Sequence, residues 1–142
     1  MFLGKYNHVL DTKSRLAIPA RYRETLNTGS VLTRGADRCL VMYPADRWQA
    51  LCARINELPL SDRDARAFRR FLFGDACEIE LDGQGRMVIP GELRTYAGIE
   101  RGVVLVGMDT VIEIWSDAAW ATMSSTFDDQ ANEIFDRLAS MI

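Results

Sequence analysis

The sequence has few of the residues that build metal sites or disulfide frameworks. It contains one histidine and three cysteines, Cys39, Cys52 and Cys77, with no Cys-x-x-Cys spacing. A zinc site needs Cys and His ligands clustered at short spacings, and His8 has no second imidazole to join it. The odd number of cysteines and their wide gaps also disfavour disulfides. We therefore expect buried free thiols, and no metal or other cofactor.

Long hydrophobic runs are missing as well. The longest aliphatic run, Val103 to Val106, is far shorter than the roughly 20 apolar residues that cross a bilayer. The opening residues, MFLGKYNH, show no long apolar stretch after a basic patch, which disfavours a secretory signal. With 48% hydrophobic and 26% charged residues among 142, the composition is typical of a soluble globular protein. We expect a cytoplasmic protein without a membrane partner.

An excess of positive charge is also absent, because 20 acidic residues outnumber 17 basic ones. A net charge of −3 by itself disfavours nucleic acid as a partner. The distribution is uneven, however. Residues 1–35 carry six basic and two acidic side chains, whereas residues 107–142 carry one basic and seven acidic ones. Because local fields decide such binding, the N-terminal part is expected to face a polyanion and the C-terminal part to face away.

The sequence repeats itself. Residues 10–23 read LDTKSRLAIPARYR and residues 81–94 read LDGQGRMVIPGELR, with Leu, Asp, Arg, Ile, Pro and Arg coinciding at an offset of 71 positions. The similarity extends to both sides of these segments. Phe2 matches Phe73 at the same offset, and after a one-residue slip Gly35 matches Gly107, Asp37 matches Asp109 and Trp48 matches Trp120. The chain is therefore interpreted as two copies of a unit of about 45 residues.

Each copy predicts the same order of short elements. Apolar and polar residues alternate over 77–81, a period of two that is typical of a half-buried strand, and Tyr6, His8 and Leu10 hold the matching positions of the first copy. His8 is therefore expected to be a half-buried strand residue. A turn follows over 11–15 and 82–86, where Asp can cap backbone N–H groups and Gly tolerates positive φ. The other expected strands are at 16–18, 31–33 and 40–43 in the first copy and at 87–89, 103–106 and 111–115 in the second. Pro19 and Pro90 are each expected at the first position of a helix, and Gly98 is expected to end the second of these helices. A further helix is expected from Trp48 to Leu58.

Two further helices are expected outside these units. One spans Ser61 to Phe73 with Ser61 as its N-cap, and its four arginines are interpreted as a solvated face that could add phosphate contacts. These are Arg63, Arg66, Arg69 and Arg70. The other, at 130–142, places Ile134, Phe135, Leu138 and Ile142 on one apolar face. That face needs a cover, either from its own core or from a neighbouring subunit.

These patterns predict an α+β fold in which both copies share one core, because a unit of about 45 residues buries too little surface alone. Trp48 and Trp120 are expected to anchor that core from matched helix faces. The expected divisions are 5–47 for the first unit, 48–75 for connecting helices, 76–119 for the second unit and 120–142 for a C-terminal helical segment.

The recurring turns are the strongest candidates for function. Arg15 and Arg86 close them, and each has an aspartate, Asp11 or Asp82, four residues upstream. Such an arginine is either a solvated partner of that aspartate or a donor toward phosphate or a guanine edge, and the two roles are compatible. An acid/base role for the aspartates is disfavoured, because no third polar group recurs beside them. Without a Gly-rich phosphate loop, a triad order or a metal cluster, an enzyme is not expected.

The paired turns, each followed by a short apolar strand and Ile-Pro, resemble the MraZ family of the AbrB-like swapped-hairpin DNA-binding group. The resemblance covers nearly the whole chain. It implies two tandem AbrB-like units that interleave into one pseudo-two-fold β-barrel core with flanking helices, and a homo-oligomeric ring of several chains. It also implies a nucleoid-associated transcriptional regulator that binds double-stranded DNA at short direct repeats upstream of the division and cell-wall gene cluster. No small-molecule partner is evident.

The same resemblance implies site residues. Arg15 and Arg86 stand where the family contacts DNA, and Lys13 adds charge to the first turn, whereas its counterpart Gln84 leaves the second turn less basic. In place of the glycine common in the first turn stands Ser14, which would cost on the order of 1 kcal/mol in a left-handed backbone.

The second turn keeps its glycine, Gly85, which we count with Asp11 and Asp82 as turn-stabilising. The alternative function is an AbrB-like antitoxin or assembly protein that acts mainly through protein binding. Two copies and an ordered-looking C-terminus count against it.

Overall fold

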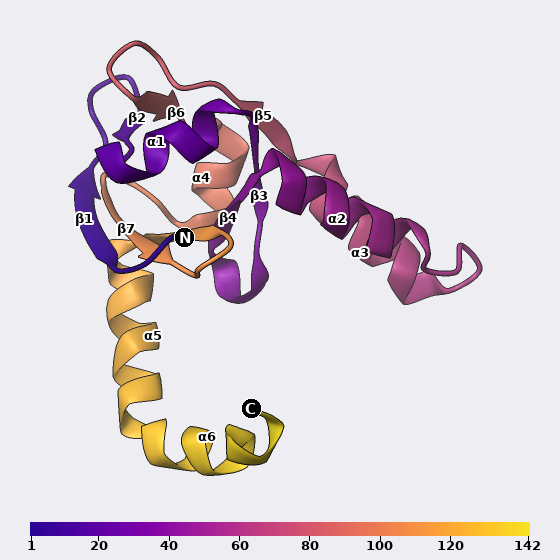
Figure 1. The fold of residues 1–142 in the computed structure, drawn as a ribbon. Coiled ribbons are helices and arrows are strands. Elements are labelled where there is room, and N and C mark those ends of the chain that lie inside the picture. The colour runs from indigo at the N-terminus through magenta and orange to yellow at the C-terminus, as the bar shows by residue number, and fades with distance from the viewer.

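A computed structural model describes residues 1–142 and shows an α+β protein, which confirms the expected fold class (Figure 1). The first repeat and its helices comprise β1 (Lys5–Val9), β2 (Arg15–Ala17), α1 (Ala20–Asn27), β3 (Ser30–Arg34), β4 (Leu40–Pro44), α2 (Ala45–Asn56) and α3 (Arg63–Gly74). The second comprises β5 (Cys77–Ile79), β6 (Arg86–Val88), α4 (Gly91–Ala97), β7 (Gly102–Gly107), β8 (Ile112–Ser116), α5 (Asp117–Asp129) and α6 (Ala131–Leu138). Short 3₁₀ turns lie at Ala36–Arg38 and Ala139–Met141.

The repeats exchange strands within one sheet. Six antiparallel strands lie in the order β1-β7-β8-β4-β3-β5, so the first strand of each repeat pairs with the third strand of the other. The sheet is open, with β1 and β5 at its edges, and does not close into the expected barrel. The reason is local: β2 and β6 pair with each other as a separate two-stranded ribbon and do not bridge the sheet edges.

Equivalent residues of the two repeats meet at the centre of this ribbon. Leu16 lies opposite Met87, its counterpart in the repeat alignment, and both side chains are buried. They belong to one hydrophobic cluster of 19 buried residues that draws on both repeats. Because burial of apolar surface is the main force that stabilises folding, neither repeat encloses its own core.

Helix ends follow local chemistry, with corrections at Pro19, Pro90, Leu58 and Ser61. Pro19 and Pro90 were expected at the first helical position, but they are the N-cap residues of α1 and α4, one residue before the first helical residue. Gly98 ends α4 in a left-handed conformation, as predicted. Leu58 lies beyond the end of α2 and is exposed.

The predicted N-cap of α3, Ser61, is wrong. Asp62 takes this position with an extended backbone, and its Oδ1 accepts a hydrogen bond of 3.0 Å from the backbone N–H of Ala65. The Asp62 N–H donates to the carbonyl of Pro59, which closes a turn before the helix and moves the cap one residue on.

Two expectations about burial also need correction. Trp48 and Trp120 are half-buried at the margins of the sheet, where Trp48 packs on Phe73 and Trp120 on Phe127. Neither joins the cluster of 19 buried residues, but Trp120 packs on buried Trp115 in a second, smaller cluster, and Trp48 packs on Tyr43 at the margin of that cluster. Of the three free cysteines only Cys39 is buried, because the other two lie on helix and edge-strand surfaces that are partly open to solvent.

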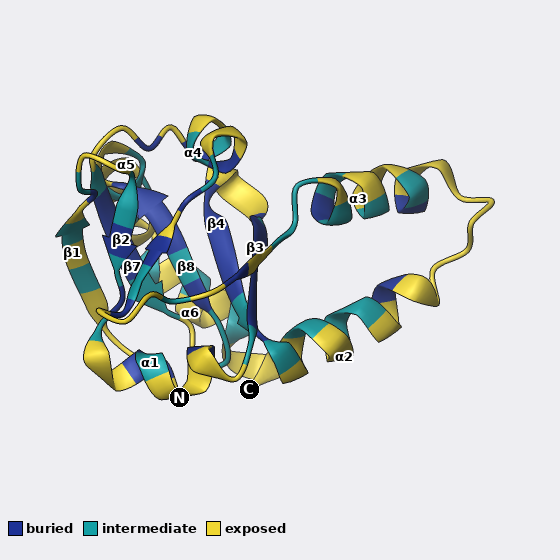
Figure 2. Cartoon of the chain, turned by 90° about the horizontal axis from the view of Figure 1, so that it is seen from above, coloured by how far each residue is buried: buried dark blue, intermediate teal, exposed yellow.

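Two helical arms project from the body (Figures 1 and 2). The α2–α3 arm leaves to one side in both views, and Figure 1 shows the α5–α6 arm leaving from the end of the body opposite the β2–β6 ribbon. Five of the seven acidic residues of the C-terminal part lie on the α5–α6 arm and therefore away from the arginine turns, as the charge distribution predicted. No helix combines the length and the hydropathy needed to cross a membrane.

Candidate nucleic-acid interface

The β2–β6 ribbon has one buried and one outward face. Leu16 and Met87 point into the core, so the residues that alternate with them point outward. Arg15 lies opposite Val88, and Ala17 lies opposite Arg86, so both arginines share the outward face. The ribbon thus brings together two arginines that lie far apart in the sequence.

The first turn is organised by Asp11. Its Oδ1 accepts hydrogen bonds of 2.9 Å from the backbone N–H groups of Lys13 and Arg15. Its Oδ2 accepts from Arg15 Nε at 2.6 Å. One carboxylate therefore fixes both the backbone of the turn and the direction of the guanidinium.

The second turn repeats this geometry around Asp82. The backbone N–H groups of Gln84 and Arg86 donate to Asp82 Oδ1 at 2.8 and 3.0 Å, and Arg86 Nε donates to Asp82 Oδ2 at 2.9 Å. Arg86 Nη1 also lies 3.8 Å from Asp11 Oδ2, so the two turns are electrostatic neighbours.

Both carboxylates are charged at neutral pH. The backbone hydrogen bond from Arg15 is the main reason that the pKa of Asp11 falls from 3.8 to about 2, against a smaller opposing effect of desolvation. The backbone N–H of Arg86 lowers the pKa of Asp82 in the same way. Each arginine uses Nε for its aspartate, which leaves its terminal nitrogens for another acceptor. The side chains of Arg15 and Arg86 are 28% and 26% exposed.

The turns need a left-handed residue before each arginine. Gly85 has φ +74° and Ser14 has φ +59°, so the position where the sequence departs from glycine does adopt the strained conformation. Ser14 therefore carries the strain expected for it.

Charge around the two turns differs. Lys13 is exposed at the tip of the first turn, and its counterpart Gln84 is exposed but neutral. The arginines of α3 do not join this surface, because the α2–α3 arm points away from the ribbon (Figure 1). Arg66 and Arg69 instead donate to Leu60 O and Asn56 Oδ1, which braces the arm.

Sequence reasoning missed a role for one pair of arginines. Arg23 Nε donates to Ile18 O at 2.9 Å, and Arg94 Nε donates to Ile89 O at 3.1 Å. Both residues recur in the repeat alignment, and that recurrence was the available signal. His8, by contrast, lies half-buried in β1, as the repeat predicted.

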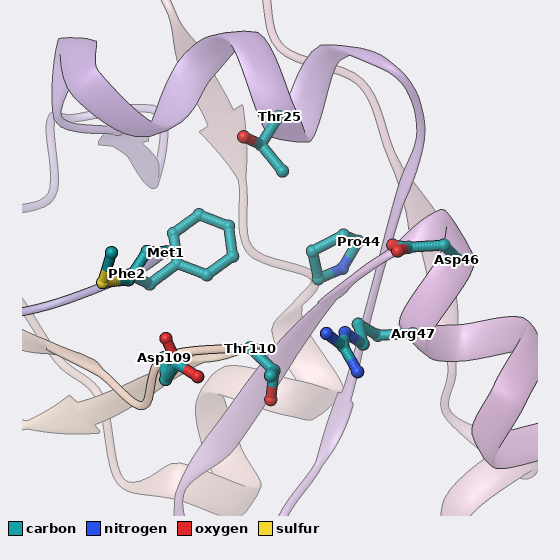
Figure 3. A pocket seen from close by; sticks show the side chains of 8 residues that line it. All are labelled: Met1, Phe2, Thr25, Pro44, Asp46, Arg47, Asp109 and Thr110. Carbon is teal, nitrogen blue, oxygen red and sulfur yellow. The ribbon is translucent and has the colours of Figure 1, made fainter.

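A pocket of about 250 Å³ lies elsewhere, between the N-terminus, α1 and the start of α2 (Figure 3). Asp46, Arg47 and Asp109 give it charges of both signs. No group of three or more His, Cys, Asp or Glu side chains could hold a metal ion, and no buried side-chain polar atom lacks a partner.

The strand order and the paired turns define a tandem-repeat α+β protein whose repeats share one sheet. Residues 1–71 and 72–141 each match the profile of a family described as "MraZ protein, putative antitoxin-like". A protein of Thermomicrobium roseum named "Transcriptional regulator MraZ" is 49% identical over 142 residues, covering 100% of both chains. Proteins of the same name from Alkaliphilus metalliredigens and Lactiplantibacillus plantarum are 46% and 47% identical, covering 99% and 96% of this chain and 95% and 99% of their own. The chain belongs to the MraZ family.

Proposed function

We propose that this chain is a sequence-specific DNA-binding transcriptional regulator that acts at short direct repeats in the promoter of its own division and cell-wall gene cluster. One observation carries the proposal: Arg15 and Arg86 share the outward face of a two-stranded ribbon, each aimed by an aspartate. The names of its relatives support the regulatory role. Such a protein is not an enzyme and acts in the cytoplasm, on the nucleoid.

The ribbon suits DNA by shape and chemistry. A two-stranded β-ribbon fits the major groove, where an arginine fork can bond guanine O6 and N7 or a phosphate bidentately. Asp11 and Asp82 hold the Nε edges, so little side-chain entropy remains to be lost on binding. Lys13, exposed at the first turn, adds a phosphate contact.

The finer architecture follows the same logic. The two strands that flank each turn both pair with strands of the other repeat, β1 with β7, β5 with β3 and β2 with β6, which supports a swapped-hairpin arrangement about a pseudo-two-fold axis. In this arrangement residues 5–47 and 76–119 form the DNA-binding units, 48–75 the connecting helices and 120–142 the C-terminal segment.

We extend the proposal to a homo-oligomeric ring. The α5–α6 arm exposes a groove of about 290 Å³ lined only by hydrophobic side chains, and Phe135 in it is 71% exposed. The lining residues are Phe127, Ala131, Ile134, Phe135, Leu138 and Ile142. The occupant proposed is the α2–α3 arm of a second copy, because residues 45–74 carry six basic and four acidic side chains, whereas residues 117–138 carry one basic and five acidic ones. That arm also exposes Leu60 and Phe68.

A charge placed in the groove tests this interface. Phe135→Asp should reduce light-scattering mass to that of a monomer, because the carboxylate would be buried without a partner. Asn132→Asp adds the same charge at an exposed position of α6 that does not line the groove and should leave the assembly intact. Self-association of Phe135→Asp equal to that of Asn132→Asp would refute this interface.

The alternative is an AbrB-like antitoxin or assembly protein. The family description and the apolar groove favour it, since such a groove fits a protein partner. DNA binding separates the two. In a gel shift with the promoter upstream of its own gene, the regulator binds and loses affinity on Arg15→Ala/Arg86→Ala, whereas the alternative shows no dependence on these arginines.

A further inference from the structure

We propose that Arg23 and Arg94 are positioning residues that brace the arginine turn of the opposite repeat. Arg23 in α1 of the first repeat holds the turn that presents Arg86, and Arg94 in α4 of the second holds the turn that presents Arg15. The inference rests on the proposed function, because its readout is DNA binding through these turns.

Arg23 lies directly against the second turn. Its Nε donates to Ile18 O at 2.9 Å, and the N–H of the same Ile18 donates to Gly85 O at 3.0 Å. A Cβ atom on Gly85 would lie 2.1 Å from Arg23 Nε and 2.4 Å from its Cζ, so the guanidinium covers the Gly85 Cα. Gly85 is buried although its neighbour Gln84 is exposed.

The first turn has a looser version of the same brace. Arg94 Nε donates to Ile89 O at 3.1 Å, and the Ile89 N–H donates to Ser14 O at 3.3 Å. Ser14 already carries a Cβ, and it is only half-buried, whereas Gly85 is buried. A guanidinium cannot cover Ser14 as closely as it covers Gly85, so the brace on the second turn is the tighter one.

This brace bears on the direction of the binding arginine. Arg86 follows Gly85 directly, and a glycine backbone, here with φ +74°, has no side chain of its own to restrict it. A binding group must be held within about 0.5 Å and 10–20° of its productive geometry. Without the guanidinium of Arg23, Gly85 loses its cover, and only the carboxylates of Asp82 and Asp11 still orient the Arg86 side chain.

Double-mutant cycles test the crossed pattern on the full chain with its promoter DNA. Arg23→Ala should weaken binding about tenfold, the factor typical of one lost charged hydrogen bond. Combined with Arg86→Ala it should add little, because the group it positions is already gone. Combined with Arg15→Ala the two losses should multiply. Arg94→Ala should add little to Arg15→Ala, and its loss should multiply with that of Arg86→Ala. Its own effect on binding should be smaller than that of Arg23→Ala.

Other roles for Arg23 give different results. If it contacted phosphate itself, its loss would multiply with both arginine variants and lower the salt slope by about 1, which would overturn the proposal. Arg23→Lys keeps the charge but has no planar group to lie over Gly85. It should therefore reproduce most of the loss, and full rescue by lysine would also overturn the proposal.

A substitution at Gly85 tests the brace from the other side of the contact and does not depend on the stability of the Arg23 variants alone. Gly85→Ala places a methyl where the Arg23 guanidinium lies, so it should impair DNA binding more in the wild type than on the Arg23→Lys background. Equal effects on both backgrounds would contradict the brace. If Arg15→Ala/Arg86→Ala weakens binding and the Arg23 variants do not, only this inference fails; if the double variant binds normally, the proposed function fails first.

Discussion

Gly85→Ala, compared with Ser14→Ala, measures the strain and packing in the two turns. At Gly85 an alanine meets a left-handed backbone with φ +74° and the Arg23 guanidinium 2.1 Å from its Cβ. The left-handed conformation costs about 1–2 kcal/mol, and displacing the guanidinium from its hydrogen bond to Ile18 O costs about 1.5–3 kcal/mol, while the lower chain entropy of alanine returns about 0.4–1 kcal/mol. A net loss of about 2–3 kcal/mol in unfolding free energy is expected.

Ser14→Ala is the matched control at the equivalent position. A Cβ is already present at φ +59°, so the change should stay within about 0.5 kcal/mol. For a chain of this size, 1 kcal/mol shifts the melting temperature by about 2–4 °C. Thermal denaturation should therefore show Gly85→Ala about 5–10 °C below the wild type, with Ser14→Ala close to it. Equal melting temperatures for the two variants would refute the reasoning about these turns.

Because the pKa of Asp11 is lowered from 3.8 to about 2, its ionised form stabilises the fold above about pH 4, and this stability is lost as the pH falls toward 2. Between pH 4 and pH 2 the melting temperature of Asp11→Asn should therefore fall less steeply than that of the wild type, and a parallel fall in both proteins would contradict this prediction. Gln84→Lys should give the second turn the charge that Lys13 gives the first, and the slope of log affinity for DNA against log salt concentration should steepen by about 1. Titrations at several salt concentrations measure this slope, and an unchanged slope would place the tip of the second turn away from phosphate. Fragments 1–60 and 61–142, expressed separately, should show no cooperative melting by circular dichroism, because the cut separates β1 from β7, β3 from β5 and β2 from β6; cooperative melting of either one would show that a repeat folds alone.

Local chemistry was predictable from the sequence. The aspartate that opens each turn, the left-handed residue before each arginine and the Gly98 helix end all follow from short-range backbone rules that residue types record. The errors at Pro19, Ser61 and Leu58 are shifts of one or two residues at helix ends, where several neighbours can satisfy the same free backbone groups.

Non-local pairing was not predictable in the same way. Nothing in β1 itself specifies β7 as its neighbour, because strand partners are chosen by packing across the whole sheet. The open sheet follows from the choice of β2 to pair with β6. The place of Arg23 against Gly85 depends on that pairing, so the repeat alignment could mark Arg23 as recurrent but could not show what it touches.

The most direct test of the central claim is the affinity of Arg15→Ala/Arg86→Ala for the promoter upstream of the protein's own gene, measured by gel shift at two salt concentrations. The control removes the same charge outside the ribbon and outside the α2–α3 arm, as Arg38→Ala/Arg137→Ala, because both side chains are exposed and neither lines the apolar groove. If each ribbon arginine reads a base, its loss should cost about 1–3 kcal/mol per contact and relax specificity. The account predicts a large loss of binding for the ribbon variant, still folded and oligomeric, with little change for the control. Wild-type affinity in the ribbon variant, or an equal loss in the control, would contradict it.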